Sequence, residues 1–192
     1  MMLRAFIALE IPHFLRQAIA EQTAALRQAL PRPLVRWVAP ENIHLTLQFL
    51  GDVSPTHLDL LIRTLQAEAA SHRPCELTIE QIGAFPTIRR PRVIWIGVTA
   101  PPALLSLQRG VQAAMSRLGY SPDEKKFSPH LTIGRVNQNA SAAELRRIQA
   151  SLEKTQVGTL GTFRAESISL FKSDLQPDGP IYTCLQRLPL QK

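Results

Sequence analysis

One four-residue pattern occurs twice in this chain of 192 residues, as HLTL at positions 44–47 and as HLTI at positions 130–133. Successive side chains of an extended strand point to opposite faces of a sheet, so the histidine and the threonine of each copy share one face. The two aliphatic residues share the other face, which can be buried. The pattern therefore predicts two half-buried strands, and we expect both of them to border one cleft.

A cleft that holds His44, Thr46, His130 and Thr132 suits an oxyanion such as phosphate. Hydroxyl groups can donate hydrogen bonds to its non-bridging oxygens, and imidazoles can move protons at the attacking and leaving oxygens. One copy alone would carry little weight, because an isolated histidine at a strand edge is usually a surface or structural residue. Two copies with the same arrangement, each with a proline shortly upstream (Pro40 and Pro129), favour a functional pair.

Hydrophobic periodicity predicts the remaining elements. Alternation of apolar residues predicts strands over 3–11, 43–50, 75–82, 93–98, 130–135, 163–172 and 181–190. Helical spacing predicts helices over 13–30, 54–69, 104–118 and 141–152. Strict alternation assigns Phe49 to the core face of its strand, together with Ile43, Leu45 and Leu47. The segment 83–92 is expected to be a loop.

Pairs of strands joined by short loops favour antiparallel pairing, so we expect an α+β fold rather than a doubly wound parallel sheet. The element order gives two halves of similar make-up, each with one motif strand. With 45% hydrophobic residues, the chain can bury a sizeable core. We expect residues 1–192 to form a single, two-lobed domain.

The charge balance favours a polyanionic partner such as RNA, because 22 Lys and Arg outnumber 15 Asp and Glu. An ordinary basic protein would have the same composition, so charge alone does not decide. Three arginines at positions 89, 90 and 92 could guide an RNA backbone or simply be solvated. Cys75 and Cys184 lack a paired spacing, which argues against a disulfide or a zinc site and favours two small buried residues. No apolar run approaches the length of about 18 residues that spans a bilayer, and the first twelve residues lack a signal-peptide pattern, so we expect a cytoplasmic protein without membrane contact.

The two motifs resemble the signature of the two-histidine phosphoesterase superfamily. Within it, the chain resembles the bacterial and archaeal RNA 2′,3′-cyclic phosphodiesterases, which have also been named 2′-5′ RNA ligases. The segments that carry this closer resemblance are FIALEIP at 6–12, RWV at 36–38, FLG at 49–51 and RVIWIG at 92–97. The resemblance extends from Leu3 to Leu190. It implies two α+β lobes related by a pseudo-twofold axis, with antiparallel sheets flanking a central catalytic cleft and helices on the outside.

The resemblance also implies the activity: opening of 2′,3′-cyclic phosphate ends to 2′-phosphate, without a metal or other cofactor. RNA ends or small cyclic nucleotides would be the substrates, and a monomer is expected. Such a hydrolysis needs a base for water and an acid for the departing ribose oxygen, and two histidines suit both roles near neutral pH. The residues alone do not assign the roles. The resemblance implies His44 as proton donor and His130 as proton acceptor, with Thr46 and Thr132 on the phosphate oxygens.

Arg135 matches a position that contacts phosphate in the family. Strict alternation, however, places it with Leu131 and Ile133, away from the cleft. Only a twist, a bulge or the end of the strand would bring its side chain round.

Three alternatives remain at this stage. The histidines could be metal ligands, although two strand histidines lack an obvious third protein ligand. The chain could be an RNA-binding module without catalysis. It could also run the same chemistry in reverse, as an ATP-independent 2′-5′ RNA ligase in which a ribose hydroxyl replaces water.

Overall fold

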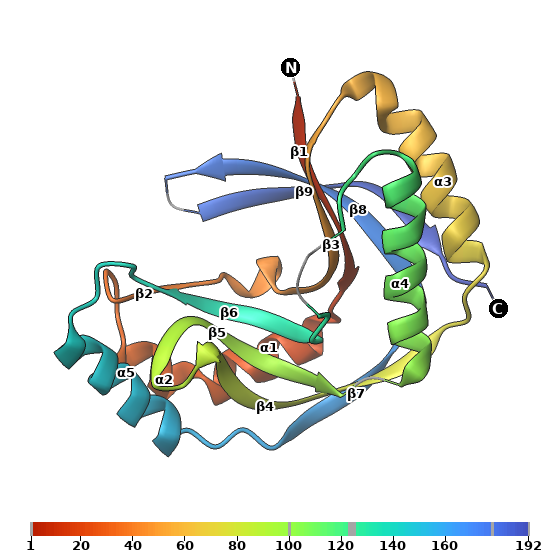
Figure 1. Cartoon of the computed structure of the whole chain (residues 1–192). Helices are drawn as coiled ribbons and strands as arrows, with labels where there is room; N and C mark the ends of the chain where they lie inside the picture. Colours follow the sequence, from red (N-terminus) through yellow and green to blue (C-terminus); the bar gives the residue numbers. More distant parts are fainter. Residues whose placement is uncertain (1, 100, 123–125, 178, 192) are drawn as a thin grey trace.

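The computed structural model describes residues 2–99, 101–122, 126–177 and 179–191, which form an antiparallel sheet flanked by helices (Figure 1). The strands are β1 (Leu3–Glu10), β2 (Val35–Trp37), β3 (His44–Val53), β4 (Cys75–Thr87), β5 (Arg90–Thr99), β6 (His130–Val136), β7 (Thr159–Ala165), β8 (Ser167–Gln176) and β9 (Gly179–Pro189). The helices are α1 (His13–Gln22), α2 (Ala24–Ala29), α3 (Leu58–Ala70), α4 (Pro102–Arg117) and α5 (Ala142–Lys154), with short 3₁₀ turns η1 (Pro40–Asn42) and η2 (Pro55–His57).

The sheet consists of two groups of strands that meet at its centre. Its order is β7-β4-β5-β6-β3-β1-β8-β9, and β2 pairs with β6 as well. All recorded strand pairs are antiparallel, so the expected α+β class is confirmed. Between the two groups, β3 and β6 share the single registered pair Leu45 and Leu131. We call β1, β3, β8, β9, α3 and α4 lobe 1, and β2, β4, β5, β6, β7, α1, α2 and α5 lobe 2.

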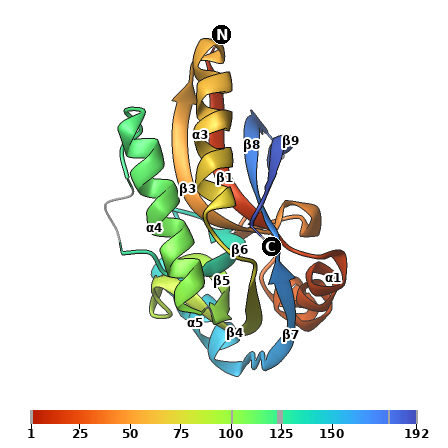
Figure 2. The same cartoon turned by 90° about the vertical axis from the view of Figure 1, so that its right-hand side faces the viewer.

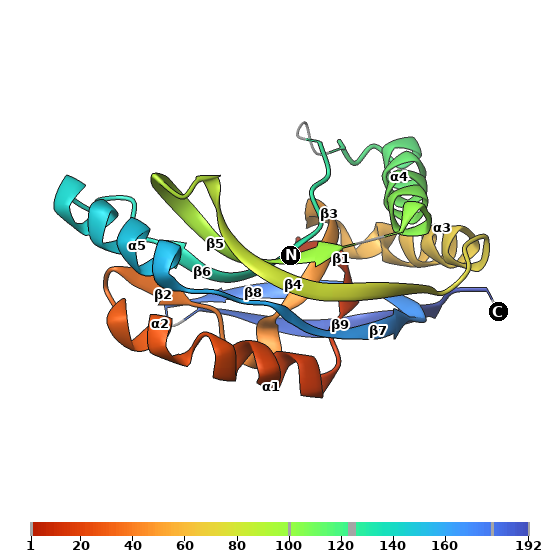
Figure 3. The same cartoon turned by 90° about the horizontal axis from the view of Figure 1, so that it is seen from below.

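The helices lie on the outside of the two lobes. Helices α3 and α4 pack together on lobe 1, whereas α1, α2 and α5 lie along lobe 2 (Figures 1 and 2). Figure 1 shows β8 and β9 on one side of the molecule and β4, β5 and β6 on the other, and the view from below superposes the two groups, so the sheet is strongly curled rather than flat (Figure 3). Each lobe contributes one motif strand, as expected. The lobes are not consecutive halves of the chain, however, because the chain passes repeatedly from one to the other.

Several local expectations are confirmed and others are corrected. The helices expected over 104–118 and 141–152 are confirmed as α4 and α5; Ser141 and Glu144 form a capping box on α5, and Gly119 has a φ of 90° just after α4. The helix predicted over 13–30 is interrupted at Thr23, which separates α1 from α2. The expected loop over 83–92 is wrong, since β4 and β5 form a long hairpin there. Cys75 is buried, but Cys184 is exposed, and both are free thiols.

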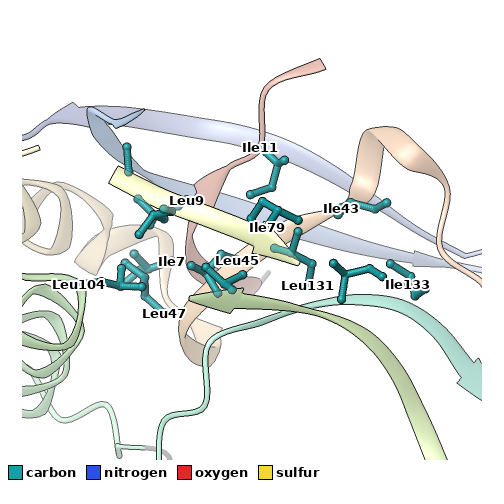
Figure 4. Close-up of a cluster of buried hydrophobic side chains, with 14 of the residues drawn as sticks. Ile7, Leu9, Ile11, Ile43, Leu45, Leu47, Ile79, Leu104, Leu131 and Ile133 are labelled. Atoms are coloured by element: carbon teal, nitrogen blue, oxygen red, sulfur yellow. The ribbon is translucent and has the colours of Figure 1, made fainter. Parts of the chain in front are cut away.

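The core lies between the helices and the aliphatic face of the sheet. Leu45, Leu47, Leu131 and Ile133 from the two motifs are each at most 1% exposed. Figure 4 shows them in one cluster with side chains of neighbouring elements, including Leu104 of α4. Burial of these side chains removes apolar area from water and fixes the face of each motif strand that must point inward.

Both motif strands contain a β-bulge immediately after the threonine. On β1, Ala8 pairs with Thr46 and Ile7 with Gln48, so Leu47 is left without a partner. On β5, Trp95 pairs with Thr132 and Ile94 with Gly134, so Ile133 likewise has no pairing partner on that strand. A bulge inserts one residue and reverses the phase of the alternation beyond it. The burial pattern from 44 to 50 is accordingly the same as that from 130 to 136.

Each bulge is held by a specific hydrogen bond to its carbonyl group. The Gln108 side chain of α4 donates to the Leu47 carbonyl at 3.4 Å, and the Val38 backbone N–H donates to the Ile133 carbonyl at 2.9 Å. A buried carbonyl needs such a donor, so these contacts stabilise the irregular backbone. The expectation that Phe49 lies in the core is wrong: the bulge turns it outward, and it is 51% exposed.

Candidate active site

The four motif side chains lie on one face of the sheet. Leu45 and Leu131 are directly opposite each other and buried, so the residues on either side of them point to the opposite face. We call this side the motif face; it carries His44, Thr46, His130 and Thr132. Antiparallel pairing places the histidine of each motif across from the threonine of the other. The two motifs are therefore related by a pseudo-twofold axis through the central leucine pair.

The two imidazoles are oriented in the same way. Nδ1 of His44 lies 2.8 Å from the carbonyl oxygen of Asn42, and Nδ1 of His130 lies 2.7 Å from the carbonyl oxygen of Ser128. A carbonyl only accepts hydrogen bonds, so each Nδ1 must carry its proton. The Nε2 atom of each ring is then the one that can accept or donate a proton at a ligand.

Aromatic side chains from lobe 1 enclose His44. Its ring stacks on Phe6 at 4.7 Å between centroids and meets the edge of Tyr182 at 5.2 Å. Burial lowers the pKa of His44 to about 4; the Asn42 carbonyl opposes this shift, and the charge of Arg135 adds to it. In the free protein near neutral pH, His44 is therefore an uncharged imidazole.

Asn42 links His44 to the outer hairpin of lobe 1. Its carbonyl accepts from His44, and its side-chain amide donates to the Pro180 carbonyl of β9 at 3.0 Å. These two bonds hold the β8–β9 hairpin beside the first motif. They explain why Tyr182, far along the chain, contacts the His44 ring.

His130 is less enclosed than His44. Phe85, on the β4–β5 hairpin, meets its ring edge-on at 4.9 Å. Burial lowers the pKa of His130, the Ser128 carbonyl acts against this shift, and Arg135 again contributes to it. Phe85 in turn packs on Trp95 at 5.3 Å. The indole of Trp95 covers Gly83, where a Cβ atom would lie 2.3 Å from the ring, so this position has room only for glycine.

Arg135 lies on the motif face, because the bulge at Ile133 reverses the phase of β6. Of the three ways in which the Arg135 side chain could reach the cleft, the structure shows the bulge. The positive charge of Arg135 contributes to lowering the pKa of both histidines. Among the described residues, Arg135 and the hydroxyls of Thr46 and Thr132 have no hydrogen-bond or ion-pair partner, so all three groups can bind a ligand.

Residues beyond the predicted set also reach this face. Phe49 occupies in lobe 1 the position that Arg135 occupies in lobe 2, since each follows the bulge of its own motif. Burial raises the pKa of Tyr182, and the charges of Arg135, Arg36 and Arg4 oppose that shift. Two adjacent buried residues follow each motif threonine and mark both bulges, but this pattern is visible only in the structure.

The other histidines lie elsewhere. His13 begins α1 and His57 ends η2, while His72 follows α3 and bonds to Glu68 at 2.8 Å. Within the described residues, no group of three or more His, Cys, Asp or Glu side chains could hold a metal ion. No helix in the described part of the chain is long and apolar enough to cross a membrane.

A family model, curated relatives and solved structures all relate this chain to the same group of proteins. Residues 15–177 match the model of the 2′-5′ RNA ligase superfamily. An RNA 2′,3′-cyclic phosphodiesterase of Methanothermobacter thermautotrophicus is 34% identical over 97% of this chain and 98% of its own. A crystal structure of a Thermus thermophilus protein superposes with a TM-score of 0.81 at 27% identity, covering 98% of both chains. The Escherichia coli LigT structure complexed with phosphate has a TM-score of 0.74 at 25% identity, covering 100% of this chain and 99% of its own. The chain belongs to the 2′-5′ RNA ligase superfamily, the two-histidine phosphoesterases.

Proposed function

We propose that this protein is an RNA 2′,3′-cyclic phosphodiesterase that opens cyclic phosphate ends to 2′-phosphate. The observation that carries the proposal is the motif face, where the Nε2 atoms of His44 and His130 and the hydroxyls of Thr46 and Thr132 are related by a pseudo-twofold axis. Relatives that bear this name match nearly the whole chain, and LigT has been crystallised with phosphate. We further propose that the enzyme acts as a cytoplasmic monomer on RNA ends or small cyclic nucleotides.

In the proposed reaction, water attacks phosphorus in line with the bond to the ribose 3′-oxygen. His130, as the base, removes a proton from the water while the new P–O bond forms. His44, as the acid, protonates the 3′-oxygen as the P–O3′ bond breaks, which leaves a 2′-phosphate and a free 3′-hydroxyl. The family resemblance supports this assignment of roles. The symmetric hydrogen bonds at Nδ1 support a pair that can work from two sides of phosphorus.

Three groups are proposed to stabilise the charge that develops on phosphate. Thr46 and Thr132 would donate hydrogen bonds to the non-bridging oxygens, and Arg135 would contribute its positive charge. These donors stand on β3 and β6 beside the central pair, and each of these strands is also paired with a neighbour, β3 with β1 and β6 with β5. Fixed donors need little reorganisation during the reaction, which is the main advantage of such a site.

The low pKa of His44 suggests that the substrate itself promotes protonation of this histidine. His44 must carry a proton to act as an acid, but burial keeps its pKa at about 4 in the free protein. A bound phosphate anion favours imidazolium and raises that pKa. Substrate binding would therefore supply the charge that holds the catalytic proton on His44.

The alternative within the same chemistry is ATP-independent 2′-5′ ligation, in which a ribose 5′-hydroxyl attacks the cyclic phosphate in place of water. The description of the matched family favours keeping this alternative. An oligonucleotide with a 2′,3′-cyclic phosphate end distinguishes the readings when its end group is identified after incubation. A 2′-phosphate supports hydrolysis, a longer RNA with a 2′-5′ linkage supports ligation, and unchanged RNA that stays bound would indicate a binding module.

The same assay tests the two histidines. His44→Ala and His130→Ala should each lower kcat by about 10²- to 10⁴-fold, and the double variant should be far less impaired than the product of the two effects. His13→Ala is the matched control, since His13 lies on α1 away from the motif face. Near-normal turnover in either motif variant would remove that histidine from the mechanism.

A further inference from the structure

A basic pocket adjoins the motif face at Arg135. Its volume is about 300 Å³, and it lies where β2 and the end of β6 run side by side. The residues that line it are Pro33, Arg36, Arg135, Val136, Asn137 and Gln138. Neither histidine lines this pocket, so it is a distinct space that shares Arg135 with the proposed phosphate site.

Two like charges face each other across this pocket. Arg36 on β2 pairs directly with Arg135 on β6, so their side chains project from the same face of the sheet at neighbouring positions. Directly opposed like charges destabilise a strand pair. Among the described residues, ion pairs form at Glu68, Glu166, Asp174 and Glu10, and none of them involves either arginine. Within the described residues, no ion pair offsets this repulsion, and an anion between the two guanidinium groups would relieve it.

The rim of the pocket adds further donors. Arg92 donates to the Gln138 carbonyl at 3.0 Å, which brings a third guanidinium to the edge. The Asn137 side-chain oxygen accepts from the Asn139 backbone N–H at 2.9 Å, so the Asn137 amide group keeps both of its hydrogens for a ligand. Arginine and amide donors together suit an oxyanion, and no described residue of the lining is acidic, which favours the same ligand class.

The position of the pocket limits which anion fits. Arg36 pairs with Arg135, four residues along β6 from Leu131 of the central pair, and neither histidine lines the pocket. The pocket therefore lies to one side of the proposed reaction centre. The 2′,3′-cyclic phosphate is the 3′ end of the RNA, so every other phosphate lies on the 5′ side of the terminal nucleotide. The nearest of these is the phosphodiester that precedes that nucleotide.

We propose that the pocket between Arg36 and Arg135 binds the phosphodiester on the 5′ side of the terminal nucleotide. The enzyme then prefers oligonucleotides with cyclic phosphate ends to cyclic mononucleotides. This inference rests on the proposed function, because it takes the terminal cyclic phosphate to lie at the histidines.

Three substrates test the inference: adenosine 2′,3′-cyclic phosphate, the same nucleotide with a 5′-phosphate, and the dinucleotide ApA with a 2′,3′-cyclic phosphate end. For the wild type, kcat/KM should rise about tenfold or more when the second phosphate is added, as expected for charge-assisted hydrogen bonds. Arg36→Gln should reduce this ratio to near one. Arg63→Gln, which removes the same charge from the exposed surface of α3, should leave the ratio at the wild-type value.

An Arg36→Gln variant that retains the full wild-type ratio, or a wild type with a ratio near one, would overturn the inference. A gain with the dinucleotide but not with the 5′-phosphate would also overturn it, since it would assign the preference to the second nucleoside.

Equilibrium binding separates this inference from the proposed function. If the wild type turns over none of the three substrates, the proposed function fails, and the pocket is then tested with ApA that ends in a 2′-phosphate. The slope of log affinity against log salt concentration should be smaller by about 0.7 in Arg36→Gln than in wild type, because one phosphate contact is lost. Equal slopes for the two proteins would refute the pocket.

Discussion

Binding of a phosphate group should raise the pKa of His44 by about three units. At about 4 Å, with an effective dielectric constant of about 20, one negative charge attracts an imidazolium by about 4 kcal/mol. About 1.4 kcal/mol corresponds to one pKa unit, so a pKa of about 4 in the free protein should become about 7 in the complex. The direction follows from sign alone, because burial disfavours imidazolium and a nearby anion favours it.

Proton NMR of the imidazole Cε1–H signals measures this shift directly. The pH titration is run with and without adenosine 2′-phosphate, and the His44 signal is identified by its loss in His44→Gln. In Arg135→Gln the free protein should show higher pKa values for both motif histidines, since the guanidinium lowers both. In kinetics, the pH profile of kcat/KM reports the pKa values of the free enzyme, and that of kcat reports those of the complex. The pKa values obtained from kcat/KM should therefore be lower than those obtained from kcat.

Two results would refute the reasoning. A His44 signal that titrates near 6.5 in the free protein would mean that the aromatic enclosure by Phe6 and Tyr182 does not exclude water. A pKa that stays below 5 when the nucleotide is bound would mean that its phosphate does not lie beside the ring.

Further predictions concern the hydroxyls, metals, acid stability and packing. Thr46→Val and Thr132→Val keep the β-branched shape but delete a donor, so kcat should fall about 10²-fold while circular dichroism stays unchanged. Excess EDTA should leave turnover unaffected, whereas loss of activity that a divalent ion restores would favour a metal hydroxide. The folded-state pKa of His44 is below its unfolded value, so neutral His44 contributes fully to the free energy of unfolding above pH 6.5. This contribution should fall by about 3 kcal/mol as the pH drops to 4, and urea unfolding of His44→Gln should lack this loss. Gly83→Ala should displace the Trp95 indole and lower stability by about 1–3 kcal/mol, as measured by thermal unfolding.

The sequence predicted the first half of each motif strand well, because alternation is a local property. From each histidine to the residue after the threonine, the buried and exposed positions follow a period of two. Alternation failed beyond that point: it assigned Phe49 to the core and placed Arg135 away from the cleft, although the family resemblance implied Arg135 at the phosphate. The reversal depends on hydrogen bonds to the bulge carbonyls from Gln108 and Val38. These donors are distant in sequence, so no short window of residues contains the information.

The β4–β5 hairpin shows a second kind of limit. Glycine, prolines and arginines between positions 83 and 92 are typical of a loop, and a loop was expected. In the structure Gly83 pairs with Trp95, and Phe85 pairs with Val93. The strand persists because the Trp95 ring packs over the glycine and beside Phe85. Tertiary packing thus overrides local propensity, and it also brings Phe85 to the edge of His130.

The interleaving of the two lobes along the chain governs how this protein can be divided. Lobe 1 takes β1 from the start of the chain and β8 and β9 from its end, and every strand of lobe 2 comes from between them. Any single cut therefore leaves fragments that each hold an incomplete sheet with unpaired edges. Although only Leu45 and Leu131 register between the lobes, neither lobe corresponds to a continuous segment that could be expressed alone. A library of truncations should accordingly yield no active half, whereas circular permutants that open the chain at an exposed turn keep every strand.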